Sequence, residues 1–332
     1  MNIAQIGCGY WGPNLLRTFN NLQDCDVKYL VERERTRMDF VQKKYPKVIV
    51  KSKLSEVLSD STVNAVVIAT PAETHYDLAK QCLEAGKHIL VEKPLTTKVC
   101  EIDSLEKIAN CQKLKVMSGH TFIYNNAVRY IKKIIDDGSL GDIRYIYSQR
   151  LNLGRIRNDI DALWNFGPHD ISIIQYWLDD LSPQSVNRHG MDFIQNGVDD
   201  VIFLNIKYPN KIMANIHVSW LDPIKTRKMV VVGSHKMVVY DDVAEYKVSV
   251  FDKGIDQKAI IGERMDYDNP SSLENFKYRS GDIQIPKIDW VEPLAQEAKH
   301  FINCIQNDLE PLTGIQHTRN VIKILESSKK IY

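Results

Sequence analysis

The first part of the chain alternates short apolar runs with segments of helical periodicity. The apolar runs are Ile3 to Ile6, Val27 to Val31, Val48 to Val50, Val63 to Ala69, His88 to Val91 and Lys115 to Ser118. Several are β-branched and apolar on both faces, which is typical of parallel strands that helices cover on both sides. Helical patterns lie between them, at Pro13 to Asn21, Thr74 to Ala85 and Lys98 to Asn110. Residues 1–120 are therefore predicted to form a doubly wound α/β domain with a parallel sheet.

The pattern changes after Gly119, where strand signals joined by turn residues dominate. The predicted strands are Ile143 to Asn152, Val198 to Tyr208, Ile212 to Trp220, Thr226 to Val232, Met237 to Tyr240 and Tyr246 to Phe251. Helices are predicted at Ala127 to Asp137, Trp164 to Leu178, Pro293 to Gln306 and Ile315 to Lys330. Residues 253–288 are polar and weakly periodic, and no structure is assigned to them. Residues 121–332 are expected to form an α+β domain with a large, mostly antiparallel sheet.

Composition narrows the class of protein. The chain has 332 residues, 44% of them hydrophobic, which is enough for two cores. Its 43 basic and 42 acidic residues give a net charge of +1, so no overall field favours nucleic acid or an anionic membrane. The N-terminus lacks a signal-like segment, and no run approaches the roughly 18 apolar residues of a membrane span. The six scattered cysteines show no metal-site spacing, so we expect a cytoplasmic protein with reduced thiols and no metal.

A glycine-rich loop, Gly7-Cys8-Gly9-Tyr10-Trp11-Gly12, follows the first predicted strand and opens the first helix. Glu32 lies 20 residues beyond Gly12, at the end of the second strand. The glycines permit a tight turn and close approach to a pyrophosphate, the helix N-terminus stabilises its charge, and the carboxylate binds the ribose hydroxyls. This combination predicts a Rossmann domain that binds NAD. Glu32 would repel the 2′-phosphate of NADP, while Arg33 beside it weakens that discrimination.

Two further segments fall at the carboxyl edge of the predicted sheet, where ligands bind in open α/β folds. Thr70 and Pro71 lead into a helix that Thr74 is expected to cap, and His75 is either exposed in its first turn or near the nicotinamide. Glu92-Lys93-Pro94 ends the fifth strand, and the proline keeps Lys93 extended. Desolvation and the positive nicotinamide would both favour neutral Lys93, which suits it to deprotonate a hydroxyl.

The helix near Trp164 carries the second candidate for acid–base chemistry. Asn165 and His169 are four residues apart, so the asparagine is placed to orient the imidazole. The alternative is a core histidine beneath Trp164. The segment before this helix holds the residues that would bind a phosphorylated substrate, since arginine pairs bidentately with phosphate oxygens. They are Arg150, Asn152, Arg155 and Arg157, and Trp164 and His169 on the helix are also expected to contact the substrate.

In order and spacing, Gly7 to Gly12, Glu92 to Pro94 and Gly167 to Asp170 resemble the glucose-fructose oxidoreductase / inositol dehydrogenase / MocA (Gfo/Idh/MocA) family. Gly7 to Asn14, Ser148 to Arg157 and Val218 to Pro223 look like its nucleotide-sugar branch, which includes UDP-N-acetylglucosamine 3-dehydrogenases. The resemblance implies that Lys93 and His169 flank a reacting carbinol. Many members have an aspartate where this chain has Asn165, and asparagine can orient the imidazole without stabilising its protonated form.

The resemblance implies NAD-dependent oxidation of a nucleotide sugar, most simply UDP-N-acetylglucosamine at C3, with an aminotransferase as a downstream partner. A 3-keto nucleotide-sugar reductase, a free polyol dehydrogenase of the inositol type and a catalytically silent NAD-binding redox sensor are the alternatives. Family members also pack their second-domain sheets into dimers or tetramers. The consecutive apolar residues Met229 to Val232 and Val201 to Leu204 agree with such a homo-oligomer, because a sheet with one wet face would alternate.

Overall fold

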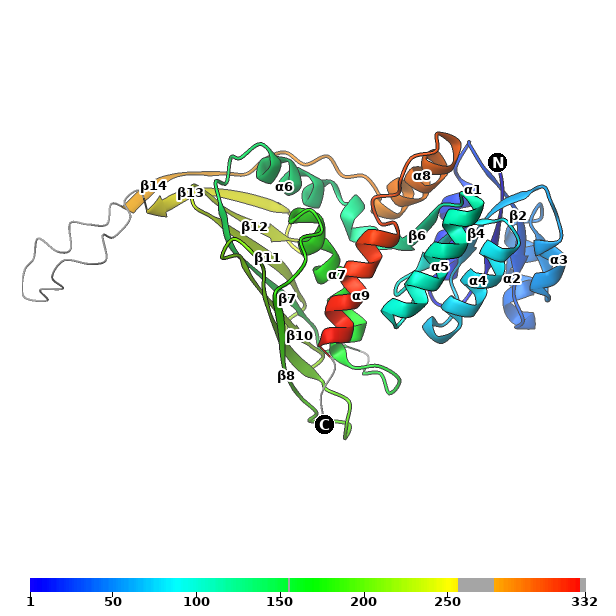
Figure 1. The fold of residues 1–332 in the computed structure, drawn as a ribbon, viewed down its shortest axis with the longest axis horizontal. Helices are drawn as coiled ribbons and strands as arrows, with labels where there is room; N and C mark the ends of the chain where they lie inside the picture. The colour runs from blue at the N-terminus through cyan, green and yellow to red at the C-terminus, as the bar shows by residue number, and fades with distance from the viewer. Residues whose placement is uncertain (155, 256–277, 329–332) are drawn as a thin grey trace, which may run out of the picture. The chain divides into compact units, whose positions relative to one another are not determined.

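The computed structural model describes residues 1–154, 156–255 and 278–328, and its contacts divide the chain into two compact units (Figure 1). Unit 1 comprises residues 1–125, 171–175 and 291–329, and unit 2 comprises residues 126–170, 176–290 and 330–332. This division differs from a single boundary at residue 120, because the two helices near the C-terminus pack with the first sheet's helices and strands. Each unit is described by itself.

Unit 1 is a Rossmann domain with the predicted parallel sheet. Its strand order is β3-β2-β1-β4-β5-β6. The strands are β1 (Asn2–Ile6), β2 (Asp26–Val31), β3 (Ile49–Lys51), β4 (Val63–Ile68), β5 (His88–Glu92) and β6 (Val116–Gly119). Ala65, Val66, Val67 and Ile68 on β4 are all fully buried, which confirms the expectation of a central strand that is apolar on both faces.

The helices of unit 1 surround this sheet. They are α1 (Gly12–Asn20), α2 (Arg35–Lys44), α3 (Leu54–Leu58), α4 (His75–Glu84), α5 (Val99–Gln112), α8 (Pro293–Gln306) and α9 (Ile315–Ser327), with short 3-10 helices η1 (Ala72–Thr74) and η2 (Thr121–Tyr124). Helices α2 and α3 were not predicted. The sequence of α2 is largely polar and buries only Val41, so its apolar stripe is too narrow for periodicity to detect.

Unit 2 is built on an eight-stranded sheet in the order β14-β13-β12-β11-β7-β10-β9-β8. Of the described strand pairings in this sheet, β7–β10 is parallel and the others are antiparallel. The predicted, mostly antiparallel sheet is therefore confirmed. The strands are β7 (Ile143–Leu151), β8 (Ser185–Met191), β9 (Val201–Lys207), β10 (Met213–Ser219), β11 (Thr226–Gly233), β12 (Met237–Asp241), β13 (Val248–Ile255) and β14 (Tyr278–Gln284). Helices α6 (Asn126–Asp136) and α7 (Ala162–Trp177) complete the described elements, with residues 171–175 of α7 counted in unit 1.

Two sequence expectations for this sheet need correction. The sequence analysis predicted no strand at β8 or β14, which lie at the two edges of the sheet. Their side chains are polar or mostly exposed, so the alternation of apolar and polar residues that marks a strand is missing. Met229, Val230, Val231 and Val232 are all buried within the chain itself, so this run does not require a partner subunit. Phe203 on β9, by contrast, is 43% exposed.

Candidate active site

The glycine-rich loop leaves β1 and enters α1, and its three glycines have different tasks. Gly7 has a φ of +88°, and a Cβ there would lie 2.7 Å from the Ala69 carbonyl oxygen. A Cβ on Gly12 would lie 2.6 Å from the Gly7 carbonyl oxygen. Gly9 differs, because a Cβ there would meet only the Arg37 guanidinium, at 3.7 Å. Gly7 and Gly12 therefore allow the chain to pack tightly, while Gly9 leaves backbone open to a pyrophosphate.

The other residues of the loop differ in exposure. Tyr10 is 95% and Trp11 40% exposed, and no side chain caps the start of α1. Such a helix end offers N–H groups to an anion, so the loop fits a dinucleotide. Cys8 is buried, and burial together with the Glu32 charge raises the pKa of its thiol to about 11. Cys8 is thus a neutral, small side chain in the loop.

Glu32 organises the loop from the end of β2. Its carboxylate accepts backbone N–H bonds from Cys8 at 2.8 Å, Arg33 at 2.7 Å and Glu34 at 3.1 Å. Burial acts to raise the pKa of Glu32, but these bonds and the Arg37 charge outweigh it and hold that pKa below its usual value. Arg37, which the sequence did not single out, lies 3.8 Å from the Glu32 carboxylate. A carboxylate offers about four acceptor sites, so Glu32 retains capacity for a ribose hydroxyl.

The segment after β4 is held by hydrogen bonds that the sequence did not predict. Thr74 donates its hydroxyl to the Pro71 carbonyl at 2.8 Å and contacts the Thr70 hydroxyl at 2.7 Å, so it does not cap α4 with its side chain. His75 is buried, and its ring nitrogens lie 2.7 Å from the Pro94 carbonyl and 2.8 Å from the Thr70 carbonyl. The exposed position for His75 is therefore wrong, and its ring joins the Thr70 and Pro94 carbonyls.

Lys93 lies where β5 ends, between two anchored neighbours. The carboxylate of Glu92 turns back to accept the Lys93 backbone N–H at 3.3 Å, and His75 holds the Pro94 carbonyl. The Lys93–Pro94 peptide is cis. Burial raises the pKa of Glu92 to about 7, while the Lys93 charge opposes this. The Trp11 side chain of the glycine-rich loop also acts to lower the pKa of Glu92.

His169 and Asn165 lie in the part of α7 that belongs to unit 2, one helical turn apart, and both are half-buried. The next residue, Asp170, is buried and accepts hydrogen bonds from Arg150 at 2.6 and 2.9 Å and from Ser148 at 2.6 Å. These contacts tie the helix to β7 immediately beside His169. They also correct the prediction for Arg150, whose buried guanidinium binds Asp170 and is not a dock for a substrate phosphate.

The remaining predicted substrate residues are placed in different ways. Arg157 is exposed and paired with Asp159, and Asn152 and Trp164 are half-buried. Arg155 lies outside the described residues. The Trp164 backbone N–H is bound by the Asp161 carboxylate at 2.8 Å, near the start of α7. Of the predicted arginines in the described part of unit 2, Arg157 therefore keeps the exposure that a phosphate ligand requires.

Sequence reasoning missed three buried groups near the carboxyl edge of the first sheet. His120 directly follows β6, and its position after a parallel strand was a usable signal. His317 on α9 contacts the His120 ring edge-on, with ring centroids 5.6 Å apart. Glu297 on α8 is fully buried, and nothing in its local sequence distinguishes it from a surface glutamate.

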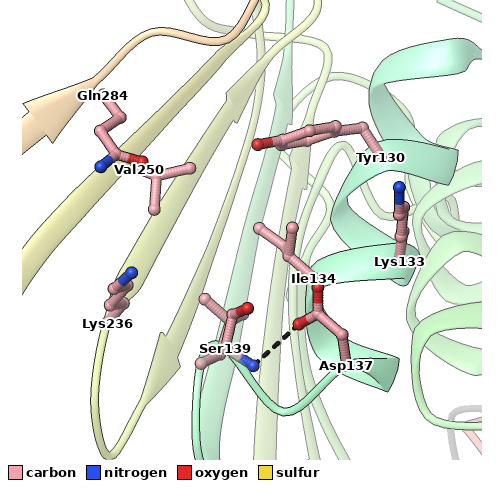
Figure 2. A pocket seen from close by; sticks show the side chains of 9 residues that line it. Tyr130, Lys133, Ile134, Asp137, Ser139, Lys236, Val250 and Gln284 are labelled. Carbon is pink, nitrogen blue, oxygen red and sulfur yellow. Dashed lines mark hydrogen bonds between the residues drawn. The ribbon is translucent and has the colours of Figure 1, made fainter.

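A pocket of about 280 Å³ lies within unit 2 (Figure 2). Lys133, Asp137 and Ser139 line it together with Lys236, and Asp137 accepts the Ser139 backbone N–H at 2.9 Å. Its lining includes none of the residues predicted for cofactor or substrate. In the described residues no group of three His, Cys, Asp or Glu side chains forms a metal site, and no helix is long and apolar enough to cross a membrane.

The parallel sheet, the open glycine loop and the acidic residue at the end of β2 define a dinucleotide-binding domain of the Rossmann class. Residues 1–120 match the family model of the oxidoreductase family with an NAD-binding Rossmann fold, and residues 128–239 match the GFO/IDH/MocA C-terminal domain. The chain belongs to the Gfo/Idh/MocA oxidoreductase family, and its first 120 residues carry that family's NAD-binding Rossmann fold.

Individual relatives in this family are varied. The scyllo-inositol 2-dehydrogenase (NADP(+)) of Bacillus subtilis is 30% identical over 43% of this chain and 39% of its own length. The chain thus spans less than half of that relative. The UDP-N-acetylglucosamine 3-dehydrogenase GnnA of Acidithiobacillus ferrooxidans has a TM-score of 0.80 at 21% identity, covering 98% of this chain and 96% of that one. GenD2 of gentamicin A biosynthesis, solved with NAD, has a TM-score of 0.80 at 20% identity, covering 99% and 93%. Both structures share the fold.

Proposed function

We propose that the protein oxidises the C3 hydroxyl of a nucleotide sugar, with UDP-N-acetylglucosamine as substrate and NAD as the hydride acceptor. The observation that supports this most is the anchoring of Lys93. Hydrogen bonds hold its own backbone N–H and the carbonyl of the next residue, so the start of its side chain is fixed at the sheet edge where ligands bind. Fixed acid–base groups at a cofactor edge are what hydroxyl oxidation requires.

Lys93 and His169 share the acid–base work in this proposal. Bound NAD would accept a hydride from the carbinol carbon. One of the two side chains accepts the hydroxyl proton, and the other donates a hydrogen bond to the developing ketone oxygen. Asn165 lies one turn before His169 and orients its imidazole, while the Asp170 contacts fix the helix backbone on the other side.

NAD is the preferred cofactor in this proposal, although Arg33 and Arg37 limit the preference. The Glu32 carboxylate would bind a ribose hydroxyl and repel a 2′-phosphate. Arg37 lies against both Glu32 and the position above Gly9, where its guanidinium would attract that phosphate. We expect kcat/KM to favour NAD without excluding NADP, and a higher kcat/KM for NADP would refute this assignment.

The diphosphate of the substrate would bind near the start of α7. Arg157 is the exposed arginine on which this proposal depends, together with Arg155, and Asn152 and Trp164 supply further contacts. Arg150 is excluded from the set because its guanidinium is buried against Asp170, whereas the Arg157–Asp159 pair is exposed. Binding energy from the UDP moiety positions C3, so free N-acetylglucosamine should lose kcat as well as affinity.

The test is NADH absorbance with a panel of UDP-hexosamines, free N-acetylglucosamine and inositol, with a ketone trap included. A trap is needed because alcohol oxidation by NAD is usually uphill, and an aminotransferase that consumes the 3-keto sugar would serve as one. NADH formation from UDP-N-acetylglucosamine supports the proposal. Turnover of inositol alone would instead establish the polyol dehydrogenase, an activity that the Bacillus subtilis relative carries in its name. Reduction of a 3-keto nucleotide sugar alone would reverse the direction, and NAD binding without any turnover would indicate a sensor.

The protein also forms a homo-oligomer in this proposal, through the open face of the sheet in unit 2. Tyr145, Phe203 and Met213 are between 40% and 45% exposed. The register pairs Met213 with Tyr145, and Phe203 with His217, whose ring stacks on it at 4.1 Å. These side chains share one face, because positions two apart on a strand point the same way. A second copy of the sheet is the partner that fits this face, and sedimentation analysis tests it.

A further inference from the structure

Two carboxyl groups of unit 1, those of half-buried Glu92 and fully buried Glu297, each have one buried oxygen without a hydrogen-bond partner. Glu297 on α8 is fully buried, and only its Oε2 is bound, by the Thr121 hydroxyl at 2.8 Å. Within the described part of the chain, Oε1 of Glu297 and Oε1 of Glu92 are buried oxygens with no hydrogen-bond partner. Buried polar oxygens are nearly always paired, so each of these two requires an explanation.

The two carboxyls border the same short segment of chain. Glu92 ends β5 and lies over Gly119, where a Cβ would be only 3.2 Å from its Oε2. Thr121, two residues further on, binds Glu297, and α8 packs against η2 here. The residue between them, His120, is fully buried, and neither of its ring nitrogens has a partner in the described residues. The missing side chain at Gly119 is what leaves room for the Glu92 carboxyl against this segment, two residues before Thr121, which binds Glu297.

Electrostatic repulsion decides how many of the two carboxyl groups are ionised. Two carboxylates in one buried site cannot both be ionised without a large cost. Burial, and then the Glu92 charge, raise the pKa of Glu297 well above its usual range. Burial raises the pKa of Glu92 to about 7, and nearby Lys93 opposes that rise. The surrounding titratable groups are His120, His317 and Lys93. Burial, then His317 and Lys93, lower the pKa of His120 well below its usual range, so it supplies no positive charge to compensate the pair.

We propose that Glu297 is a neutral carboxylic acid that donates a hydrogen bond to the Glu92 carboxylate, and that this carboxyl pair positions Lys93. The bond satisfies both orphaned oxygens with one proton. Glu92 holds the Lys93 backbone N–H through its other oxygen. Glu297 therefore acts through Glu92 on the lysine. The positioning role rests on the proposed function of Lys93, whereas the protonation of Glu297 does not.

Infrared spectroscopy of the whole protein tests the protonation directly. At pH 8 the exposed carboxyls are ionised, so the carbonyl band of a neutral carboxylic acid, shifted in D2O, should come from this pair. Glu297→Gln should remove the band. The matched control is Glu310→Gln, which makes the same chemical change at a carboxylate that is 86% exposed, and it should leave the band intact. No band in the wild-type protein, or a band that survives in Glu297→Gln, would overturn the proposal.

Kinetics test the positioning role, with whichever alcohol the substrate panel identifies. Glu297→Ala should lower kcat by up to about 100-fold, because a small displacement of a catalytic group is costly, while the KM for NAD changes little. Glu297→Gln should restore most of this loss, since its amide can still donate to Glu92 and accept from Thr121. Wild-type kcat in Glu297→Ala, or an equal loss in both variants, would refute the positioning role. Turnover of a polyol instead of a nucleotide sugar would overturn the proposed substrate and leave this comparison intact.

Discussion

Replacing Glu32 by glutamine tests how the cofactor loop is held. The carboxylate accepts backbone N–H bonds from Cys8, Arg33 and Glu34, at 2.7 to 3.1 Å, and Glu32 is only 8% exposed. Glutamine keeps one acceptor oxygen and turns its NH2 toward at least one of these donors. A hydrogen bond to a charged group contributes about 1.5–3 kcal/mol. We therefore expect Glu32→Gln to lower the free energy of unfolding by about 1.5–3 kcal/mol near pH 7, and to weaken NAD binding.

The stability difference between wild type and Glu32→Gln should depend on pH in a definite direction. Because the pKa of Glu32 is held below its ordinary value of 4.5, its stabilisation is complete above that value and is lost as the pH falls through the folded-state pKa. The difference between wild type and variant should thus shrink in acid. Urea unfolding at about pH 7 and about pH 3 measures it, with Glu34→Gln, a half-exposed carboxylate, as the control. Equal stability of wild type and Glu32→Gln at pH 7, or a difference that acid leaves unchanged, would refute the reasoning.

Four further outcomes are expected. Lys93→Met and His169→Ala should each lower kcat about 100- to 10,000-fold with NAD affinity retained, and near-normal turnover would remove that residue from the mechanism. Asn165→Asp should move the pH–rate limb that depends on His169 to higher pH, because a carboxylate stabilises the imidazolium; an unchanged profile would mean that the two side chains do not interact. Arg157→Ala should raise the KM for the nucleotide sugar far more than the KM for NAD, and equal changes would exclude a diphosphate contact. Phe203→Glu should dissociate the proposed homo-oligomer in sedimentation analysis, and an unchanged mass would exclude this face as the interface.

The fold was predictable where a strand is buried on both faces, because such a strand is a continuous apolar run in the sequence. β4 is apolar at every position from Ala65 to Ile68, and a continuous apolar run of this length indicates a buried strand. β8 and α2 carry no such signal, because an edge strand and an exposed helix bury too little for a pattern to appear. Their structure depends on neighbours that lie elsewhere in the chain.

The site was predictable where one local segment carries the whole signal. The glycines and Glu32 follow from a spacing that pyrophosphate and ribose impose. The partners of His75 and Arg150 could not be predicted from spacing. His75 binds the carbonyl of Pro94, 19 residues away, and Arg150 binds Asp170, 20 residues away, and sequence spacing cannot show which polar groups meet. Glu297 is the strongest case, because only the folded chain shows that its carboxyl is buried against Thr121.

The proposed activity is the removal of a hydride from C3 of a nucleotide sugar. UDP-N-acetylglucosamine deuterated at C3, incubated with the protein, NAD and a ketone trap, tests it, because mass spectrometry of the reduced cofactor shows which hydrogen was transferred. We expect deuterated NADH from the wild-type protein and almost none from Lys93→Met at the same protein concentration. Unlabelled NADH from the wild-type protein would place the oxidation at another carbon, and no NADH from this sugar alongside turnover of a free polyol would contradict the substrate assignment.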